Sequence, residues 1–385
     1  MLSIKGFVIS ILWILVFFMG ISTIKLKNTI VSFPFKNMQY EIRYFFIVIA
    51  FWMFGICVQD TYDIYWYRYL YENRMPHGKE PLFDLLQFSL HDLGVSFSVF
   101  RFFWITIIAV LLFRGIRKYA DYPSCVFALS IFSILSSFVT QLRSAMVCAI
   151  ILNIIPLLFT GKTKDRITYI IIVVLCAQLH IVGYAYLFLI VLKRGERRIY
   201  KGKYYILVAA LTVFAIGMNS VFGDLTLRLL NYIPALENTN SVSRIASSID
   251  GIGAPIKSAV FLVFKHVFLY VLTDYACSRQ LEDWTIEYRK RNVIEIIREM
   301  NMLFLLFIPV AIIDESFERI FNPMCFIQYA MIFNVRKEKV GLSSKLSISI
   351  PMDYVLIGLT ILMYIVSLKS NPDDFIRMMN SLSFR

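Results

Sequence analysis

The sequence predicts an all-α protein that crosses a membrane about ten times and carries one further helical hairpin. Two observations lead to this prediction. The 385 residues are 58% hydrophobic, with 34 Phe and a mean hydropathy of +0.68, which is more apolar surface than a soluble core of this size holds. The apolar residues also form long runs that short clusters of Lys and Arg separate. Such clusters are typical of the loops between membrane helices.

The apolar runs define the expected spans, since a helix needs about 20 residues to cross the hydrocarbon core. We expect spans near residues 7–24, 42–58, 99–113, 124–140, 143–160, 204–222, 258–273, 300–313, 322–335 and 352–368. The first run is longer than the apolar core of a signal peptide, and no small-residue cleavage site follows it. We therefore predict that it is a membrane helix.

Clusters of Lys and Arg predict the orientation of these spans, because short basic loops stay in the cytoplasm. The clusters comprise Lys25, Lys27 and Lys36; Arg114, Arg117 and Lys118; Lys162, Lys164 and Arg166; Lys193, Arg194, Arg197 and Arg198; Arg289, Lys290 and Arg291; and Arg336, Lys337 and Lys339. We interpret the net charge of +13 as this topology signal and expect no nucleic-acid partner.

Residues 167–192 form one apolar run with a basic cluster at each end. A single crossing cannot keep both ends in the cytoplasm. We therefore predict a re-entrant hairpin of two half-helices, near 167–177 and 181–192, with Gln178, Leu179 and His180 at its tip. One ordinary crossing with an uneven charge count is the alternative.

One membrane domain over residues 1–385 is the expected organisation. Alternation of the spans turns an amphipathic loop at 59–98, a larger loop at 223–257 and a short loop at 314–321 toward the outer face. Residues 274–299 mix charges with apolar side chains, and we expect an amphipathic helix on the cytoplasmic surface there. The six cysteines are scattered singly, so no disulfide framework is expected.

The segment from Asp60 to Tyr69 is dense in carboxylates and aromatic side chains. Carboxylates accept hydrogen bonds from sugar hydroxyls, and aromatic faces cover the apolar patches of a sugar ring. We therefore assign Tyr62, Asp63 and Tyr65 to sugar binding, with an interfacial aromatic belt as the alternative. Asp60 and Asp63 have a spacing that is too common to indicate a metal, and we expect neither a metal nor a cofactor.

Arg143 lies in a tight turn between two predicted spans, with no other charged residue from 122 to 161. A guanidinium presents five donors in a fixed fork and stays charged, which suits a diphosphate. The alternative is an arginine that reaches out to the membrane surface. We assign the neighbouring Gln141 to sugar binding.

Four further residues are candidates at the outer face. Glu80 precedes Pro81 at a predicted helix start, either as a cap or as a substrate contact. His180 has a reference pKa near neutral and is able to accept or donate a proton, although a histidine that only packs is the alternative. Arg319 and Arg244, in the two later outer loops, are further candidates to bind an anion.

Several short segments together resemble the EpsG/Wzy family of membrane polymerases for bacterial surface polysaccharides. They are Asp60-Thr61-Tyr62, Glu80-Pro81-Leu82-Phe83, Gln141-Leu142-Arg143, Leu179-His180 and a late Arg319. The resemblance runs from about residue 40 to 335 and depends mainly on order and spacing. The family usually has a glycine before the aspartate, where this chain has Gln59.

The resemblance implies a glycosyltransferase with a GT-C-like fold in the bacterial inner membrane, with its active site on the periplasmic or outer face. Its substrates would be two oligosaccharide repeat units on undecaprenyl diphosphate, joined into an O-antigen, capsule or exopolysaccharide. Arg143 and Arg319 would bind the lipid diphosphate as it departs, and the configuration at the anomeric carbon would invert. A base for the acceptor hydroxyl would be Asp60, Glu80 or His180. A protein that regulates chain length would be a fitting partner.

Two other functions compete with a polymerase. A flippase or exporter of lipid-linked sugars also needs cations in a cavity, but the predicted topology turns every polar candidate outward, which favours an enzyme. A ligase that transfers a finished chain uses the same kind of site, and the sequence leaves this choice open. The chain has no Walker A, G-x-S-x-G or H-E-x-x-H motif, so ATP-driven transport and zinc proteolysis have no support.

Overall fold

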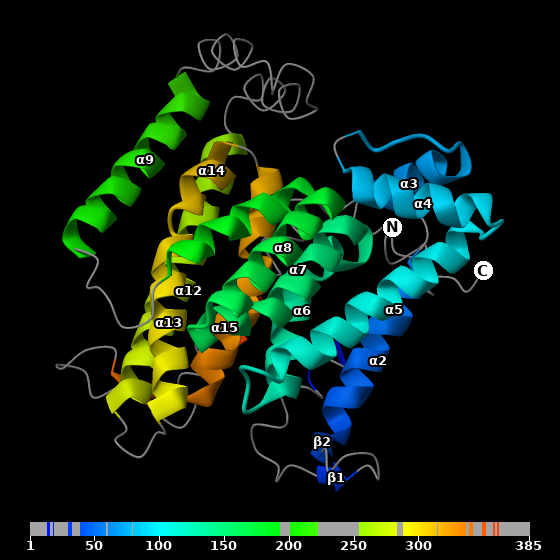
Figure 1. Cartoon of the computed structure of the whole chain (residues 1–385). Coiled ribbons are helices and arrows are strands. Elements are labelled where there is room, and N and C mark those ends of the chain that lie inside the picture. Colours follow the sequence, from blue (N-terminus) through cyan, green and yellow to red (C-terminus); the bar gives the residue numbers. More distant parts are fainter. Residues whose placement is uncertain are drawn as a thin grey trace. The chain divides into compact units, whose positions relative to one another are not determined.

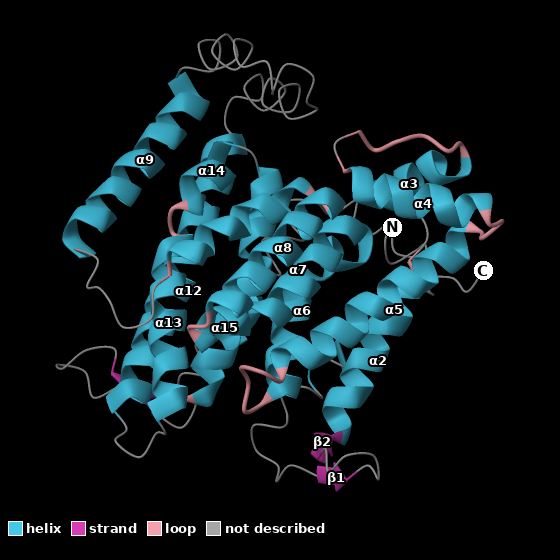
Figure 2. Ribbon diagram, viewed as in Figure 1, coloured by secondary structure: helices cyan, strands magenta, loops and turns pink. Residues whose placement is uncertain are grey.

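The computed structural model describes residues 14–15, 18, 30–32, 39–58, 61–78, 80–192, 201–221, 254–282, 288–313, 315–335, 339–341, 349–351, 357–358 and 360–361. These residues are mostly helical, as predicted (Figures 1 and 2). Two short antiparallel strand pairs accompany the helices. They are β1 (Ile30–Ser32) with β2 (Gln39–Glu41), and β3 (Lys339–Gly341) with β4 (Ser349–Pro351).

The packing divides the chain into two compact units. Unit 1 comprises Met1–Ile190 and Cys325–Arg385, and unit 2 comprises Val191–Met324. The expectation of one membrane domain stays a prediction.

Unit 1 contains most of the long helices. They are α2 (Ile42–Cys57), α3 (Tyr62–Glu72), α4 (Pro81–Asp92), α5 (Phe97–Ile116), α6 (Pro123–Thr140), α7 (Leu142–Ile154) with the 3-10 turn η2 (Ile155–Thr160), α8 (Thr163–Leu179), the 3-10 helix η3 (Ile181–Val191) and most of α15 (Asn322–Asn334). The predicted spans at 42–58, 99–113, 124–140 and 143–160 correspond to α2, α5, α6, and α7 with η2.

Side chain to backbone hydrogen bonds show how α5 and α7 run. Nε1 of Trp104, early in α5, donates to the carbonyl of Leu142 at the start of α7, over 2.9 Å. The Tyr119 hydroxyl, just after α5, donates to Leu152 near the end of α7, also over 2.9 Å. The two helices are therefore parallel, and α6 returns the chain between them. The basic clusters at 114–118 and 162–166 consequently lie at one end of unit 1, and Arg143 lies at the other.

The chain folds back at His180, the predicted tip of the hairpin, whereas the re-entrant course of this hairpin in the membrane stays a prediction. The Tyr169 hydroxyl on α8 donates to the Tyr186 carbonyl on η3 over 2.9 Å, and Nη2 of Arg166 donates to the Ile190 carbonyl over 3.2 Å. A Cβ atom on Gly183 would lie only 2.5 Å from the backbone nitrogen of Ala177, which shows how closely the two arms approach. Both ends of the run lie at the basic end of unit 1. The first arm is longer than expected, since α8 begins at Thr163.

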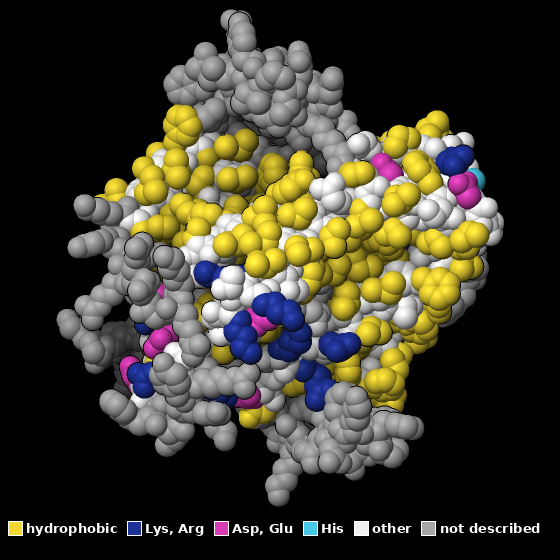
Figure 3. Space-filling view, in the orientation of Figure 1, with side chains coloured by type: hydrophobic (Ala, Val, Ile, Leu, Met, Phe, Trp, Pro, Cys, Tyr) yellow, Lys and Arg dark blue, Asp and Glu magenta, His cyan; other side chains and the backbone are white. Residues whose placement is uncertain are grey.

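Large apolar side chains remain exposed along two helices of unit 1. They are Phe102, Phe103, Ile107 and Val110 on α5, and Ile167, Ile171, Val174 and Leu175 on α8. Figure 3 shows apolar side chains over much of the displayed face, with Lys and Arg gathered on a limited part of it. Exposed apolar surface of this extent suits contact with lipid.

Unit 2 consists of α9 (Lys201–Val221), α12 (Ala254–Glu282), α13 (Tyr288–Phe304), α14 (Phe307–Ile313), the 3-10 helix η4 (Glu315–Phe321) and the first residues of α15. A bidentate ion pair joins α12 to α13, since Arg298 donates to both carboxylate oxygens of Asp274, over 2.6 and 3.0 Å. The Tyr204 hydroxyl on α9 donates to the Met302 carbonyl over 2.6 Å.

The prediction of a separate amphipathic helix over 274–299 is wrong. Helix α12 continues to Glu282, and α13 begins at Tyr288. The charge of Asp274 does not end α12, because Arg298 neutralises it from the neighbouring helix. The large outer loop also ends earlier than predicted, since α12 begins at Ala254.

Among the described residues, four helices are long and apolar enough to cross a membrane. They are Phe97–Ile116, Leu142–Thr160, Ala259–Glu282 and Lys290–Ile313, and α2 with α3, bent by 63°, is a fifth if the pair is one span. The count of about ten spans stays a prediction. Most of the expected spans at 7–24 and 352–368 lies outside the described residues.

Candidate functional site

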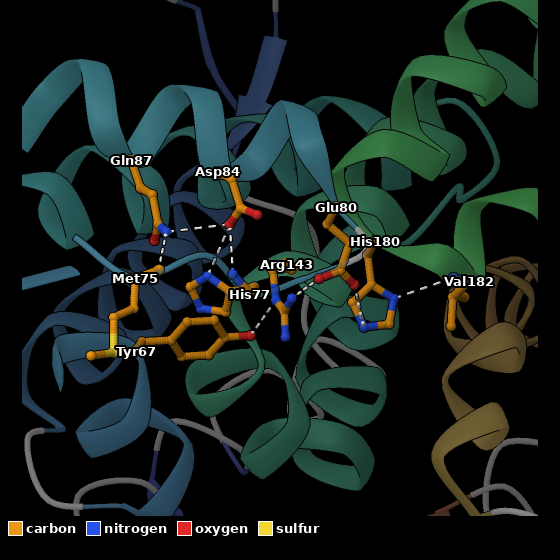
Figure 4. Close-up of polar contacts among 9 residues, drawn as sticks. All are labelled: Tyr67, Met75, His77, Glu80, Asp84, Gln87, Arg143, His180 and Val182. Atoms are coloured by element: carbon orange, nitrogen blue, oxygen red, sulfur yellow. Dashed lines mark hydrogen bonds and ion pairs between the residues drawn. The ribbon is translucent and has the colours of Figure 1, made fainter. Parts of the chain in front are cut away.

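A buried polar cluster occupies the end of unit 1 that lies away from the basic clusters (Figure 4). It draws Tyr67 from α3, Glu80 from the start of α4, Arg143 from the first turn of α7 and His180 from the end of α8. These residues are far apart in the sequence, and Glu80 and His180 are only 6% and 7% exposed. We name this group the Arg143 cluster.

Local sequence fixes the two short helices beside the cluster. The Thr61 hydroxyl caps α3 by accepting a hydrogen bond from the backbone N–H of Ile64 over 3.4 Å. Pro81 occupies the first turn of α4, where its missing N–H and fixed φ are tolerated. Glu80 is the N-cap residue of α4, yet its side chain makes no capping hydrogen bond. Its carboxylate therefore serves partners elsewhere.

Trp104 places the start of α7 against α4. Its indole N–H donates to the Leu142 carbonyl, and its ring meets that of Phe83 edge-on with centroids 5.2 Å apart. Phe83 is fully buried. This packing fixes the first turn of α7 beside the first turn of α4.

The guanidinium of Arg143 is held by two polar groups and two rings. Nη1 forms an ion pair with Oε2 of Glu80, and Nε donates to the Tyr67 hydroxyl over 3.0 Å. Its carbon atom lies 5.2 Å from the ring centroid of Tyr67 and 5.5 Å from that of Phe83. The side chain is 18% exposed, so this charge is largely shielded from solvent.

The second oxygen of Glu80 faces His180. Oε1 lies 3.9 Å from Nε2 of the imidazole, which is within ion-pair range but too long for a hydrogen bond. Nδ1 of His180 accepts from the backbone N–H of Val182 over 3.3 Å. Because Nδ1 accepts, we assign the proton of the neutral ring to Nε2, which then directs an N–H toward Glu80.

His77 and Asp84 form a second polar pair beside Arg143. Oδ1 of Asp84 accepts from the backbone N–H of His77 over 2.9 Å and lies 3.3 Å from its ring Nδ1. The imidazole packs against Tyr67 and Phe83, with centroids 5.3 and 4.9 Å away. Nε2 of His77 is buried and has no hydrogen-bond partner among the described residues. Burial first, and then the charge of Arg143, lowers the pKa of His77 to about 3.

The Arg143 cluster is suited to hold an anion. A guanidinium near a helix N-terminus combines a full charge with the dipole and the unpaired N–H groups of that turn. A carboxylate and an imidazole beside it are the groups that transfer protons in acid–base chemistry. Within the described residues, no group of three or more His, Cys, Asp or Glu is placed to hold a metal ion.

The predicted sugar-binding residues lie in different surroundings. Tyr62 and Tyr65 are 72% and 65% exposed, on the side of α3 opposite the buried Tyr67 and Tyr71. With Trp66 and Tyr69 they form an exposed aromatic face, which fits both a sugar platform and an interfacial belt. This face is separate from the Arg143 cluster.

The other predicted residues have these positions. Asp63 is partly buried in the first turn of α3, and Gln141 is partly buried at the N-cap of α7. Oε1 of Gln141 is buried and has no hydrogen-bond partner in the part of the chain that the structure describes. Arg319 lies in η4 of unit 2, partly buried. Asp60 and Arg244 lie outside the described residues.

Unit 2 has a partly buried ionic group of its own. Nζ of Lys265 on α12 lies 2.5 Å from Oε1 of Glu318 on η4, and Nε2 of His266 lies 3.8 Å from the same oxygen. The His266 ring stacks on Phe321 with centroids 3.7 Å apart. These contacts fasten η4, and with it Arg319, to the middle of α12.

Tyr67, His77 and Asp84 are not among the site residues that the sequence predicts. A signal was present for Asp84, because it shares the buried face of the amphipathic α4 with Phe83 and Gln87. A carboxylate on the apolar side of a helix indicates a specific partner. The partner, His77, lies seven residues earlier in a loop, and periodicity does not reveal it.

Comparison with known proteins gives one result. Residues 42–378 match the family model described as EpsG family. No curated protein and no solved structure matches the chain.

Proposed function

The chain belongs to the EpsG family, and we propose that it is a membrane glycosyltransferase that polymerises a bacterial surface polysaccharide. Its substrates are oligosaccharide repeat units carried on undecaprenyl diphosphate. The growing chain is transferred from its lipid diphosphate to a hydroxyl of the next unit. The reaction takes place at the outer face of the inner membrane, and the lipid bilayer is the protein's immediate surroundings.

The observation that supports this proposal most directly is the pairing of Arg143 with Glu80 in one buried cluster. A lipid diphosphate is already a good leaving group, so the enzyme needs positive charge directed at it and a positioned hydroxyl with a base. Arg143 supplies the charge, and Glu80 and His180 supply groups for the proton. Arg319 and Arg244 are proposed to assist in binding the diphosphates, and Asp60 is a further base candidate.

The topology of unit 1 supports the outer-face location. The basic clusters at 114–118 and 162–166 lie at one end of this unit and the Arg143 cluster at the other. By the positive-inside rule the basic end is cytoplasmic, and the Arg143 cluster then faces outward. A single displacement by the acceptor hydroxyl inverts the anomeric carbon, because attack comes from the side opposite the diphosphate.

The decisive experiment uses the purified full-length protein with lipid-linked repeat units from its own host. A ladder of products on a gel, one repeat apart, is the expected result. One transfer of a finished chain to another acceptor would indicate a ligase. Movement of lipid-linked sugar across sealed vesicles without chain growth would indicate a carrier.

A further inference from the structure

The contacts of Glu80 indicate a more specific role for it than the sequence does, and this role rests on the proposed function. We propose that Glu80 is the base for the acceptor hydroxyl, and that the arrival of a diphosphate at Arg143 converts it into an effective base. Substrate binding and proton transfer are then coupled through one carboxylate.

The first support is that the Glu80 carboxylate contacts both Arg143 and His180. Oε2 pairs with Nη1 of Arg143, while Oε1 lies 3.9 Å from Nε2 of His180. The side chain is only 8% exposed, so these two groups, rather than water, dominate its surroundings. Its position is well fixed, because Pro81 and the first turn of α4 follow it directly.

The second support is the effect of the ion pair on basicity. Protonation of Glu80 while it is paired would leave the largely buried guanidinium of Arg143 without its counter-charge, which is costly. A carboxylate in this arrangement is a poor proton acceptor. Glu80 therefore needs a change of partner before it can act as a base.

A diphosphate provides that change. It carries more negative charge than a carboxylate and accepts two parallel hydrogen bonds from a guanidinium. Arg143 lies in the first turn of α7, where the helix dipole also favours an anion. The diphosphate therefore competes successfully with Glu80 for Arg143, and it adds negative charge next to the carboxylate. Both effects make the Glu80 carboxylate a stronger proton acceptor.

His180 keeps Glu80 in place when Arg143 turns to the diphosphate. Nδ1 of the ring accepts the N–H of Val182, so the N–H at Nε2 remains directed at the carboxylate. This N–H, 3.9 Å away, gives the buried carboxylate a polar neighbour, yet it stabilises the negative charge less than a guanidinium does. His180 is thus a positioning residue for Glu80.

The chemical step balances as follows. The acceptor hydroxyl gives its proton to Glu80, and its oxygen forms a bond to the anomeric carbon of the donor. The bond from that carbon to the phosphate oxygen breaks, and its electron pair stays on the diphosphate beside Arg143. Glu80 returns its proton to water once the diphosphate has left and Arg143 pairs with it again.

The test measures two properties of the full-length Glu80→Gln variant: affinity for inorganic pyrophosphate by calorimetry, and chain growth with lipid-linked repeat units. Glutamine has the same shape but neither competes as an anion nor accepts the proton. We expect pyrophosphate to bind several-fold more tightly than in the unchanged protein, while chain growth falls by about 100-fold or more. Weaker pyrophosphate binding would mean that Glu80 only holds Arg143 in position. Unchanged chain growth would mean that Glu80 is not the base. Either result overturns the proposal.

A matched control and a second measurement make the test independent of one variant. Asp92→Asn breaks an exposed ion pair with Arg74 at the other end of α4 and should change neither property. In the unchanged protein, infrared difference spectra with and without pyrophosphate should show shifted carboxylate stretching bands, because Glu80 loses its pairing with Arg143, and unshifted bands would overturn the coupling. The pyrophosphate measurements need no chain growth, so they remain informative if the proposed polymerase activity fails.

Discussion

The hydroxyl of Tyr67 accepts a 3.0 Å hydrogen bond from Nε of Arg143, and the same ring lies under the guanidinium with 5.2 Å from its centroid to the guanidinium carbon. Tyr67 on α3 thus fixes both the direction and the plane of the Arg143 guanidinium on α7. The remaining edge of the fork is directed at Glu80. The orientation of this guanidinium is therefore built into the packing of three helices before any anion binds.

The Tyr67→Phe variant removes the hydroxyl and keeps the ring. We expect chain growth to fall about tenfold, because Nε of Arg143 loses an acceptor and the fork is free to rotate, while one lost hydrogen bond costs about 1 kcal/mol of stability. Steady-state assays and thermal unfolding of the purified variant measure the two effects. Tyr275→Phe, which removes a hydroxyl that accepts from Nε of Arg279 in unit 2, is the matched control. Equal losses in the two variants would argue against a special role for Tyr67.

Arg143→Lys keeps the positive charge and removes the planar fork. Lysine cannot contact Tyr67 and Glu80 in the same geometry, and it binds a diphosphate as a point charge. We expect chain growth to fall by about 100-fold, with a smaller loss for Arg143→Lys than for Arg143→Gln. Gel analysis of products over time provides the measurement. Full activity of the lysine variant would show that the fork is unnecessary.

His77 should make the stability of the protein depend on pH. Its pKa in the folded protein is lowered from 6.5 to about 3, by burial first and by Arg143 second. The unfolded chain therefore binds a proton that the folded chain does not, and stability falls as the pH drops from 6.5 toward 3. At pH 5 this loss is about 2 kcal/mol. The His77→Gln variant should lose this part of the pH dependence in unfolding experiments between pH 7 and 5, and an identical slope in both proteins would contradict the prediction.

Gly183→Ala should disturb the hairpin of α8 and η3. The new methyl group would lie 2.5 Å from the backbone nitrogen of Ala177, and backbone cannot move aside as a flexible side chain does. We expect a loss of about 1–3 kcal/mol in unfolding free energy, together with lower chain growth because His180 shifts at the hairpin tip. Gly358→Ala adds the same methyl group where no atom of the described residues lies within 4 Å, and it should behave like the unchanged protein. Equal stability of the two variants would mean that the arms separate readily.

A double-mutant cycle on Lys265 and Glu318 tests the ionic group of unit 2. Either single change, Lys265→Met or Glu318→Gln, leaves the other group without its partner, and the double change removes both. The Glu318 side chain is 37% exposed, so we expect a modest coupling energy of about 1 kcal/mol. Thermal unfolding of the four proteins measures it. Additive losses would show that the contact contributes no coupling.

The helices of unit 1 were largely predictable because their apolar runs end at clear local signals. Ser96 caps α5, which begins two residues before the predicted span, and Thr61 and Pro81 mark the starts of the two short helices. The hairpin was predictable from charge alone, because both ends of one apolar run carry basic clusters. These features depend on neighbours in the sequence.

The features that were not predictable depend on contacts between distant residues. Helix α12 continues through Asp274 because Arg298, 24 residues later, neutralises its charge. Arg101 is 3% exposed within an apolar helix, and the carbonyl of Gly55 at the end of α2 accepts from it. Glu80 and Arg143 were both selected as site residues, but their pairing follows only from the tertiary packing, in which α4 and α7 both lie against α8. Sequence patterns indicate which residues are unusual, and packing decides their partners.

Glu80 occupies the position where a helix usually has a side chain that accepts from its first amides, yet its carboxylate makes no such hydrogen bond. The length of the glutamate side chain explains why it does not cap the helix. A carboxylate with one methylene fewer closes a tight ring onto the amide two or three residues ahead, whereas the longer arm of glutamate extends past that amide to a guanidinium on another helix. At this position an aspartate would cap its own helix, whereas the glutamate forms an ion pair with another helix. A change from glutamate to aspartate would therefore keep the charge and lose the contact.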